Sequence, residues 1–401
     1  MGFVLKLRKF YANMAAAKGA TKAERRQIRR KIMSSTRADD FVETHHDDLE
    51  VIKLIQQRTF PAEVMSARKL LVVVVPEHNA MSGGIYSMFS IAEQLRRVKS
   101  VHGYEVVLMT RPNGEADTYF RNTNFRNSEN VYRFSQLLKC LNVEELCLHI
   151  PEYAAASFCD DLSPFELAYL SDRKVYVNIL NQNIQLMPEP AQLSGLKSIA
   201  QEVSQSVAHH AYSGQEIAAK YGLPTLLLPA YTDLSAYPGC GFDGKEKLII
   251  YSLDEAGYKD RCLKAVAEAF PDFRLVEIRG ITFDQFMDLA TRCMFSITFG
   301  EGFDGYLAQP TLQGGIGFAV YNDDFFPSVH FKDYPNIFDD EDDMVDNIVA
   351  VMRRLAGDKA EYELLNKKFA AEYDSLYSYE DYVARIKRLS LRDFDVFPSE
   401  G

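Results

Sequence analysis

A continuous aliphatic run, Lys69–Pro76 (KLLVVVVP), is the feature that most narrows the folds open to this chain. Its length and its four valines suit a strand buried on both faces, as in parallel sheets covered by helices. A loop containing Gly83 and Gly84 follows, and Ile85–Val98 then has the apolar spacing of a helix. With a further strand at Tyr104–Thr110, the pattern predicts a βαβ unit and a Rossmann-like α/β domain.

The same alternation of strands and helices continues and then starts again. In the first series, strands are predicted at Glu145–Ile150, Lys174–Leu180 and Val207–Tyr212, and helices at Val131–Leu141 and Ser163–Leu170. In the second series, strands are predicted at Lys247–Ser252, Phe273–Ile278, Met294–Thr298 and Gly317–Tyr321, and helices at Asp260–Phe270, Phe283–Cys293 and Tyr377–Leu389. The glycine-rich Pro238–Gly244 is the best linker candidate by composition. We therefore predict two Rossmann-like domains, residues 67–236 and 237–376, with an arm and connecting helix at 1–66 and a closing helix at 377–401.

The composition agrees with a globular protein of this size. The 401 residues allow two ordinary domains, and 47% apolar with 25% charged residues is typical of soluble chains. The longest aliphatic run, Leu70–Val75, is far shorter than the ~20 residues of a membrane span, and we expect no signal peptide. The six cysteines form no C-x-x-C pair, which favours a reduced cytoplasmic protein without disulfides.

Charge is distributed unevenly. Residues 1–37 hold eleven Lys and Arg against one acid, a net +10, so that the rest of a chain of net charge −11 carries −21. A basic segment with interspersed apolar residues can lie on an anionic membrane, which would make the protein peripheral on the inner face of the cell membrane. The alternative is a solvated arm that packs on another subunit. The acidic body argues against nucleic-acid binding.

A glycine-rich turn between two predicted strands is the best candidate for a site. It lies in Met294–Asn322 and carries Glu301, with Gln309 eight residues further on and Gly314 five beyond that. A strand-to-helix turn with glycines presents backbone N–H groups at the positive end of a helix, which suits a phosphate or sugar phosphate. The chain lacks the G-x-G-x-x-G fingerprint, which disfavours an NAD enzyme.

This turn resembles the E-x7-E signature of retaining, nucleotide-sugar-dependent glycosyltransferases of the family 4-like group. In that group the motif reads E-G-F/W-G and then E-A-x-A-x-G; here Glu301, Gly302, Phe303 and Gly314 match, and Gln309 replaces the second glutamate. The resemblance covers roughly residues 69–391. It implies a GT-B fold, in which two Rossmann-like domains enclose a cleft and the last helix crosses back to the first domain.

The resemblance also implies roles for individual residues. Glu301 would bind the donor sugar, Gly302 and Phe303 the phosphate, and Gln309 the ribose. His149 occupies the place of a histidine that often lines the donor sugar, although a structural histidine is the alternative. Gly83 and Gly84 would approach the diphosphate and the acceptor, unless they form a plain tight turn. The arginine expected after the second domain's first strand is absent, so the candidate cations are Lys259, Arg261 and Arg279; surface charge is the alternative.

The implied reaction is transfer of a sugar from a nucleotide diphosphate, with no cofactor and no metal, to a growing glycan or lipid-linked acceptor of a surface polysaccharide. The amide-rich Asn178–Pro188 is a candidate acceptor contact. Because Gln309 and the missing arginine depart from the pattern, a catalytically silent GT-B module that acts as a scaffold or partner is an alternative. Another GT-B enzyme, such as a nucleotide-sugar epimerase or an inverting transferase, is a third.

Overall fold

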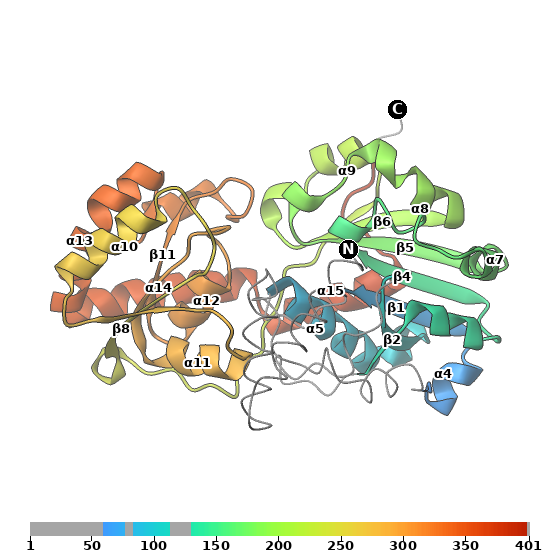
Figure 1. Ribbon diagram of the computed structural model, residues 1–401, viewed down its shortest axis with the longest axis horizontal. Coiled ribbons are helices and arrows are strands. Elements are labelled where there is room, and N and C mark those ends of the chain that lie inside the picture. The colour runs from blue at the N-terminus through green and yellow to red at the C-terminus, as the bar shows by residue number, and fades with distance from the viewer. Residues whose placement is uncertain (1–58, 77–82, 113–129, 399–401) are drawn as a thin grey trace, which may run out of the picture.

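The protein forms two helix-covered parallel sheets, one in each half of the chain (Figure 1). The computed structural model describes residues 59–76, 83–112 and 130–398. The basic segment 1–37 therefore lies outside the described residues. Within them, no helix is both long enough and apolar enough to cross a bilayer.

The first sheet has seven parallel strands in the order β3-β2-β1-β4-β5-β6-β7. Its strands are β1 (Lys69–Val75), β2 (Glu105–Thr110), β3 (Val131–Tyr132), β4 (Glu145–Pro151), β5 (Lys174–Asn181), β6 (Glu202–Val207) and β7 (Thr225–Leu227). The aliphatic run forms β1, and its two faces enter two different cores: Leu71 packs with residues of helix α5 (Gly83–Arg97), and Leu70 packs with Phe134 and Phe158 on the other side. A strand buried on both faces is thus confirmed.

The remaining helices of the first half are short. They are α4 (Ala62–Ser66), α6 (Lys99–His102), α7 (Pro164–Ser171), α8 (Ser194–Ile199) and α9 (Gln215–Tyr221). Two predictions for this half are wrong. Val131–Leu141 forms the short strand β3 and a 3₁₀ helix at Phe134–Lys139, and the strand expected at Val207–Tyr212 ends at Val207. The strand that precedes Val207, β6, carries polar Ser204, Gln205 and Ser206, which are hydrogen-bonded inside the sheet.

The second sheet has five strands in the order β12-β11-β10-β8-β9. They are β8 (Glu246–Tyr251), β9 (Arg274–Glu277), β10 (Cys293–Ile297), β11 (Ile316–Val320) and β12 (Ile337–Phe338). Helices α10 (Lys259–Ala269), α11 (Phe283–Arg292), α12 (Gly305–Leu312) and α13 (Glu341–Gly357) surround this sheet. Its core is rich in phenylalanine, and Phe295, Phe318 and Phe331 are almost fully buried.

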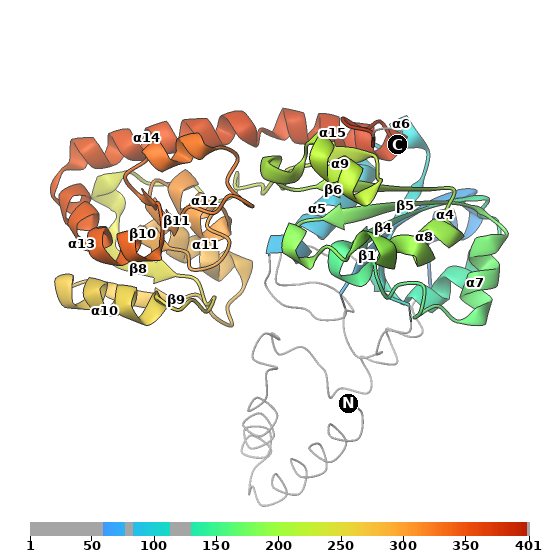
Figure 2. The ribbon, with the colours of Figure 1, turned by 90° about the horizontal axis from the view of Figure 1, so that it is seen from above.

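The last two helices connect the two halves. Helix α14 (Lys359–Leu376) packs in the second half, and α15 (Tyr379–Leu391) continues across onto α5 and α6 of the first (Figure 2). Tyr379 accepts a hydrogen bond from Gln94 at 2.7 Å, and the hydroxyls of Tyr382 and Ser90 are 3.1 Å apart. The predicted closing helix that returns to the first domain is therefore confirmed.

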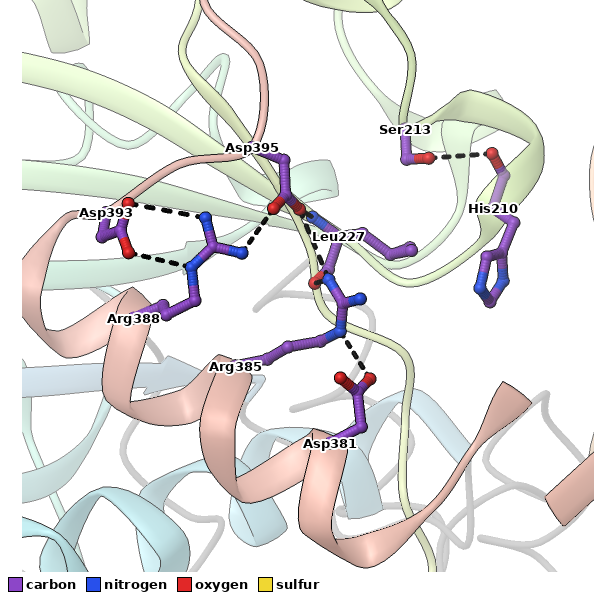
Figure 3. Close-up of polar contacts among 8 residues, drawn as sticks. All are labelled: His210, Ser213, Leu227, Asp381, Arg385, Arg388, Asp393 and Asp395. Atoms are coloured by element: carbon purple, nitrogen blue, oxygen red, sulfur yellow. Dashed lines mark hydrogen bonds and ion pairs between the residues drawn. The ribbon is translucent and has the colours of Figure 1, made fainter. Parts of the chain in front are cut away.

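Beyond α15 the chain reaches the edge of the first sheet. The backbone of Val396 pairs with Thr225 of β7, and the Asp395 carboxylate accepts a hydrogen bond from the Leu227 amide at 2.9 Å. Arg385 and Arg388 of α15 connect this tail to the helix (Figure 3). The tail and α15 thus attach the end of the chain to the first domain.

Candidate functional site

The loop after β10 holds a glycine that no other residue can replace without movement. Gly302 has φ +86°, and a Cβ there would lie 2.6 Å from the Val320 carbonyl oxygen and 2.9 Å from the Phe326 ring. An L side chain would have to overcome both the left-handed backbone and the contact with rigid backbone. Within the described residues, the amides of Glu301, Gly302 and Phe303 donate no intramolecular hydrogen bond. Successive amides around a left-handed residue can bind an anion.

Asp304 ends this loop and begins the next helix. Its Oδ1 accepts from the amides of Tyr306 (2.8 Å) and Leu307 (3.2 Å), which caps α12, while its Oδ2 accepts from the Thr298 hydroxyl. Burial raises the pKa of Asp304 to about 6 despite these bonds. The cap holds the loop in register with α12, so the position of Glu301 is set by the backbone around it.

Glu301 lies where the two halves of the protein meet. Asn183, just beyond β5 of the first sheet, donates a hydrogen bond from Nδ2 to Glu301 Oε1 at 2.8 Å. Burial, reinforced by the charges of Asp304, Asp254 and Glu152, raises the pKa of Glu301 to about 7. Among the described residues no arginine or lysine forms an ion pair with it. The carboxyl can therefore exchange a proton near neutral pH.

Glu152 is a second such carboxyl, and the sequence analysis missed it. It follows directly after β4 in the first half, and only 3% of its surface is exposed. Burial raises its pKa to about 7, although backbone amides of Gln182 and Asn183 oppose this. Its position after His149-Ile150-Pro151, at the carboxyl end of a predicted strand, was a signal that could have identified it, because ligands bind at that edge of parallel sheets.

The three candidate cations are already occupied by carboxylates or carbonyls. Lys259 is 6% exposed; its Nζ donates to the carbonyls of Leu253 and Asp254 and lies 3.3 Å from Glu277. Arg279 donates to the same Glu277 at 2.9 Å, and Arg261 pairs with Asp342 at 2.9 Å. In this conformation Lys259 stabilises the loop after β8, and none of the three ion pairs involves Glu301.

The other predicted donor contacts lie in different environments. Phe303 is buried in the aromatic core with Phe326 and Phe331, so its ring has a structural role. Gln309 lies on α12 with its amide folded toward Gly305, where a Cβ would meet Gln309 Oε1 at 2.4 Å. Both residues are within the segment that follows Glu301, as the motif requires.

The glycine pair of the first half lies at the start of α5. Gly83 has open space around its Cα, and a Cβ on Gly84 would lie 3.6 Å from the Gln182 side chain. Gln182 adjoins Asn183, so the start of α5 is near the residue that contacts Glu301. The rest of the predicted glycine loop, residues 77–82, lies outside the described residues.

His149 lies inside the first sheet. Its side chain has no exposed surface, Nε2 is 3.7 Å from the Cys147 sulfur, and Nδ1 is 3.3 Å from the Asn178 amide nitrogen. Burial lowers its pKa to about 3, which keeps the ring neutral. Both ring nitrogens thus face protein groups, and this geometry gives no support to a sugar contact.

The described ranges contain no group of three or more His, Cys, Asp or Glu side chains arranged to hold a metal ion. The one D-x-D sequence, Asp393–Asp395, is engaged instead by Arg388, which donates to both carboxylates (Figure 3). Arg385 bridges Asp381 (2.6 Å) and the Leu227 carbonyl oxygen (2.9 Å) beside them. These aspartates have a structural role in holding the tail.

Comparison with known proteins supports the fold. The sequence matches no protein-family profile, and no curated protein matches it. Among solved structures, a sucrose-phosphate synthase from Thermosynechococcus elongatus matches with a TM-score of 0.52 at 12% identity, over 81% of this chain and 99% of that one. An alpha-glucosyltransferase in complex with UDP-glucose and DNA containing an abasic site matches with a TM-score of 0.49 at 11% identity, over 79% and 98%. The two parallel sheets and the returning helix make this a GT-B fold.

Proposed function

We propose that this protein is a glycosyltransferase that binds a nucleotide-diphosphate sugar between its two domains and transfers the sugar with retention of configuration. The observation that carries the proposal is the half-buried carboxyl of Glu301, which lies after the carboxyl end of β10, forms no ion pair within the described residues and accepts a hydrogen bond from Asn183 of the other domain. A carboxylate in this position can accept hydrogen bonds from sugar hydroxyls, and such bonds are stronger than those between neutral groups.

The loop beside Glu301 supports the placement of the donor phosphate. The amides of Glu301, Gly302 and Phe303 have no intramolecular acceptor within the described residues, and Gly302 has the left-handed conformation of an anion-binding turn. Gln309, on the helix that follows, would meet the ribose, where its amide can both donate and accept. The departing diphosphate would help to deprotonate the acceptor hydroxyl, and no metal ion is required in this scheme.

For the acceptor we propose a growing glycan or a lipid-linked intermediate of a surface polysaccharide. This part of the proposal rests on the family resemblance and on the basic segment 1–37, which would hold the protein at an anionic membrane. Flotation of the full chain with vesicles of phosphatidylcholine, with and without phosphatidylglycerol, tests it. Binding only to the anionic vesicles, lost at high salt, is the expected result.

One observation favours a second candidate, a catalytically silent GT-B module that acts as a scaffold. Lys259, Arg261 and Arg279 are all engaged by carboxylates of the protein, so no cation among these candidates is directed toward a diphosphate. A silent module would keep the fold and lose donor binding. The same experiment therefore separates the two candidates.

That experiment is a thermal-shift screen of the full chain against UDP-, GDP-, dTDP- and CMP-sugars. A donor at a hundred times its dissociation constant adds ~2.7 kcal/mol to the free energy of unfolding, which gives a clear rise in Tm. We expect one nucleotide class to stabilise the wild type and the Glu216→Gln control, an exposed glutamate of α9, but not Glu301→Ala. The absence of any shift in a folded sample would favour the silent module.

A further inference from the structure

Glu152 is a buried carboxyl, and one of its oxygens has no hydrogen-bond partner in the part of the chain that the structure describes. Its Oε2 has no hydrogen-bond partner among the described residues, and the residue is 3% exposed. A buried polar atom without a partner destabilises the folded state, and more so when the group is charged. Such atoms need a specific explanation. Glu202 Oε1 in the same domain is another, so it is the position of Glu152 near Glu301 that sets this carboxyl apart.

Glu166 of the same domain shows how a structural glutamate with the same burial is satisfied. It is also 3% exposed, yet its Oε2 accepts from the Ser163 amide at 2.8 Å and from the Ser163 hydroxyl at 2.7 Å. These bonds form the capping box of α7. Burial alone therefore does not force a glutamate to remain unpaired in this domain.

The Glu152 carboxyl lies in the same electrostatic environment as Glu301. Its charge acts on Glu301 together with those of Asp304 and Asp254, and both Glu301 and Glu152 act on the buried Tyr212. The sheet also places Glu152 near Asn183: Pro151, just before Glu152, is paired with Leu180 of β5, and Asn183 follows three residues after Leu180. The Asn183 side chain donates to Glu301 at 2.8 Å. Two carboxyls, one from each domain, thus lie close to the same end of β5.

We propose that Glu152 is a second sugar-binding carboxyl, whose free oxygen accepts a hydrogen bond from a hydroxyl of the sugar bound beside Glu301. This inference rests on the proposed function and adds to it a ligand contact from the first domain. A sugar hydroxyl fits the site because it can donate a hydrogen bond to a carboxylate oxygen. The hydroxyl belongs either to the donor sugar or to the acceptor.

The decisive variant is Glu152→Gln, which keeps the size of the side chain and removes its charge, with Glu166→Gln as the matched control. Calorimetric titrations compare the nucleoside diphosphate alone with the nucleotide sugar selected by the thermal-shift screen. If the hydroxyl is the donor's, Glu152→Gln lowers affinity for the nucleotide sugar about tenfold and leaves affinity for the nucleoside diphosphate within about twofold, as expected for one charge-assisted hydrogen bond.

If the hydroxyl is the acceptor's, donor affinity and donor hydrolysis stay the same in Glu152→Gln, while transfer to the acceptor falls about tenfold through a higher KM for the acceptor. Glu152→Asp keeps the charge but moves it back by one methylene. It should retain more activity than Glu152→Gln whether the hydroxyl belongs to the donor or to the acceptor. Melting curves of each variant show that it is folded.

The proposal is overturned if Glu152→Gln binds and transfers as the wild type does, or if Glu166→Gln produces the same losses. A failure of the underlying function looks different. In that case neither the nucleoside diphosphates nor the nucleotide sugars bind the wild type, and the proposed role of Glu152 is lost together with the proposed function.

Discussion

Two groups of acidic side chains in this protein differ in whether a cation lies beside them. At the end of the chain, Asp381 of α15 and Asp393 and Asp395 of the tail each pair with Arg385 or Arg388, and the Arg388 guanidinium lowers the pKa of Asp393 (Figure 3). Glu152 of the first domain and Glu301 of the second form no ion pair within the described residues, and burial raises the pKa of each to about 7. The paired carboxylates stabilise the fold, whereas Glu152 and Glu301 are the carboxyls to which we assign a ligand.

The largest expected effect is at Glu301. Glu301→Gln should reduce kcat/KM for sugar transfer about 100-fold, because charge-assisted bonds to sugar hydroxyls contribute ~1.5–3 kcal/mol each. Its Tm should be equal to or above that of the wild type, since the substitution removes a buried charge. Initial rates of nucleotide release measure the first quantity. Wild-type rates in Glu301→Gln would remove the distinction between the two groups.

The tail should show the reverse pattern. Asp395→Ala removes the partner of Arg385, Arg388 and the Leu227 amide, so we expect a loss of ~2 kcal/mol in the free energy of unfolding with donor affinity unchanged. Asp346→Ala, an exposed aspartate of α13, is the control and should lie within ~0.5 kcal/mol of the wild type. Urea denaturation gives both values. If Asp395→Ala kept wild-type stability but lost donor affinity, the distinction between the two groups of carboxylates would be contradicted.

Stability should depend on pH through the carboxyls of Glu152 and Glu301. Because the pKa values of Glu152 and Glu301 are raised in the folded state, the folded protein binds more protons than the unfolded chain between about pH 4.5 and 7. Their contribution to stability is therefore present below pH 4.5 and is lost as the pH rises through about 7. Glu152→Gln should remove part of this loss, on the order of 1 kcal/mol at pH 8.

Melting curves from pH 4 to pH 8 measure this difference between wild type and variant. The control is Asp393→Asn. Because the pKa of the Asp393 carboxyl is lowered in the folded state, this variant should lose stability at every pH above the pKa of a free aspartate side chain. An identical pH profile in wild type and Glu152→Gln would show that the Glu152 carboxyl is not destabilising in the folded state.

The smallest effect should come from the exposed pair Arg261–Asp342. Its side chains are 58% and 79% exposed, and surface pairs of this kind contribute ~0–1 kcal/mol. If the pair is only structural, Arg261→Ala changes stability by less than ~0.5 kcal/mol and leaves nucleotide affinity unchanged. If Arg261 leaves Asp342 to bind the diphosphate, affinity falls about tenfold, which would favour the active enzyme over the silent module. Titration with the nucleoside diphosphate decides between these results.

Much of the fold could be predicted from local patterns. The aliphatic run of β1 and the regular alternation of strands and helices were enough for two Rossmann-like domains, because strands buried on both faces have an unmistakable composition. The prediction failed at β3 and β6. Strand β6 carries Ser204, Gln205 and Ser206 in its buried part, and their hydrogen bonds to β5 and β7 cannot be read from one sequence.

The site was predictable only in part. The motif names Glu301 and Gly302 as candidates, and the left-handed conformation of Gly302 explains why a glycine is needed at that position. Asn183 lay within an amide-rich segment that had been assigned to the acceptor, and its contact to Glu301 depends on how the two domains meet. The occupation of Lys259 by Glu277 was likewise invisible, because it depends on the packing of α10 beside β9.

Proton release on donor binding tests the central claim most directly. Calorimetric titration of the selected nucleotide sugar at pH 7, in two buffers of different ionisation enthalpy, measures the protons exchanged on binding. If hydroxyls of the ligand bind the carboxylate form of Glu301, whose pKa is about 7, the wild type releases protons and Glu301→Gln releases fewer. Equal proton exchange in the two proteins would show that the unpaired carboxyl does not contact the ligand.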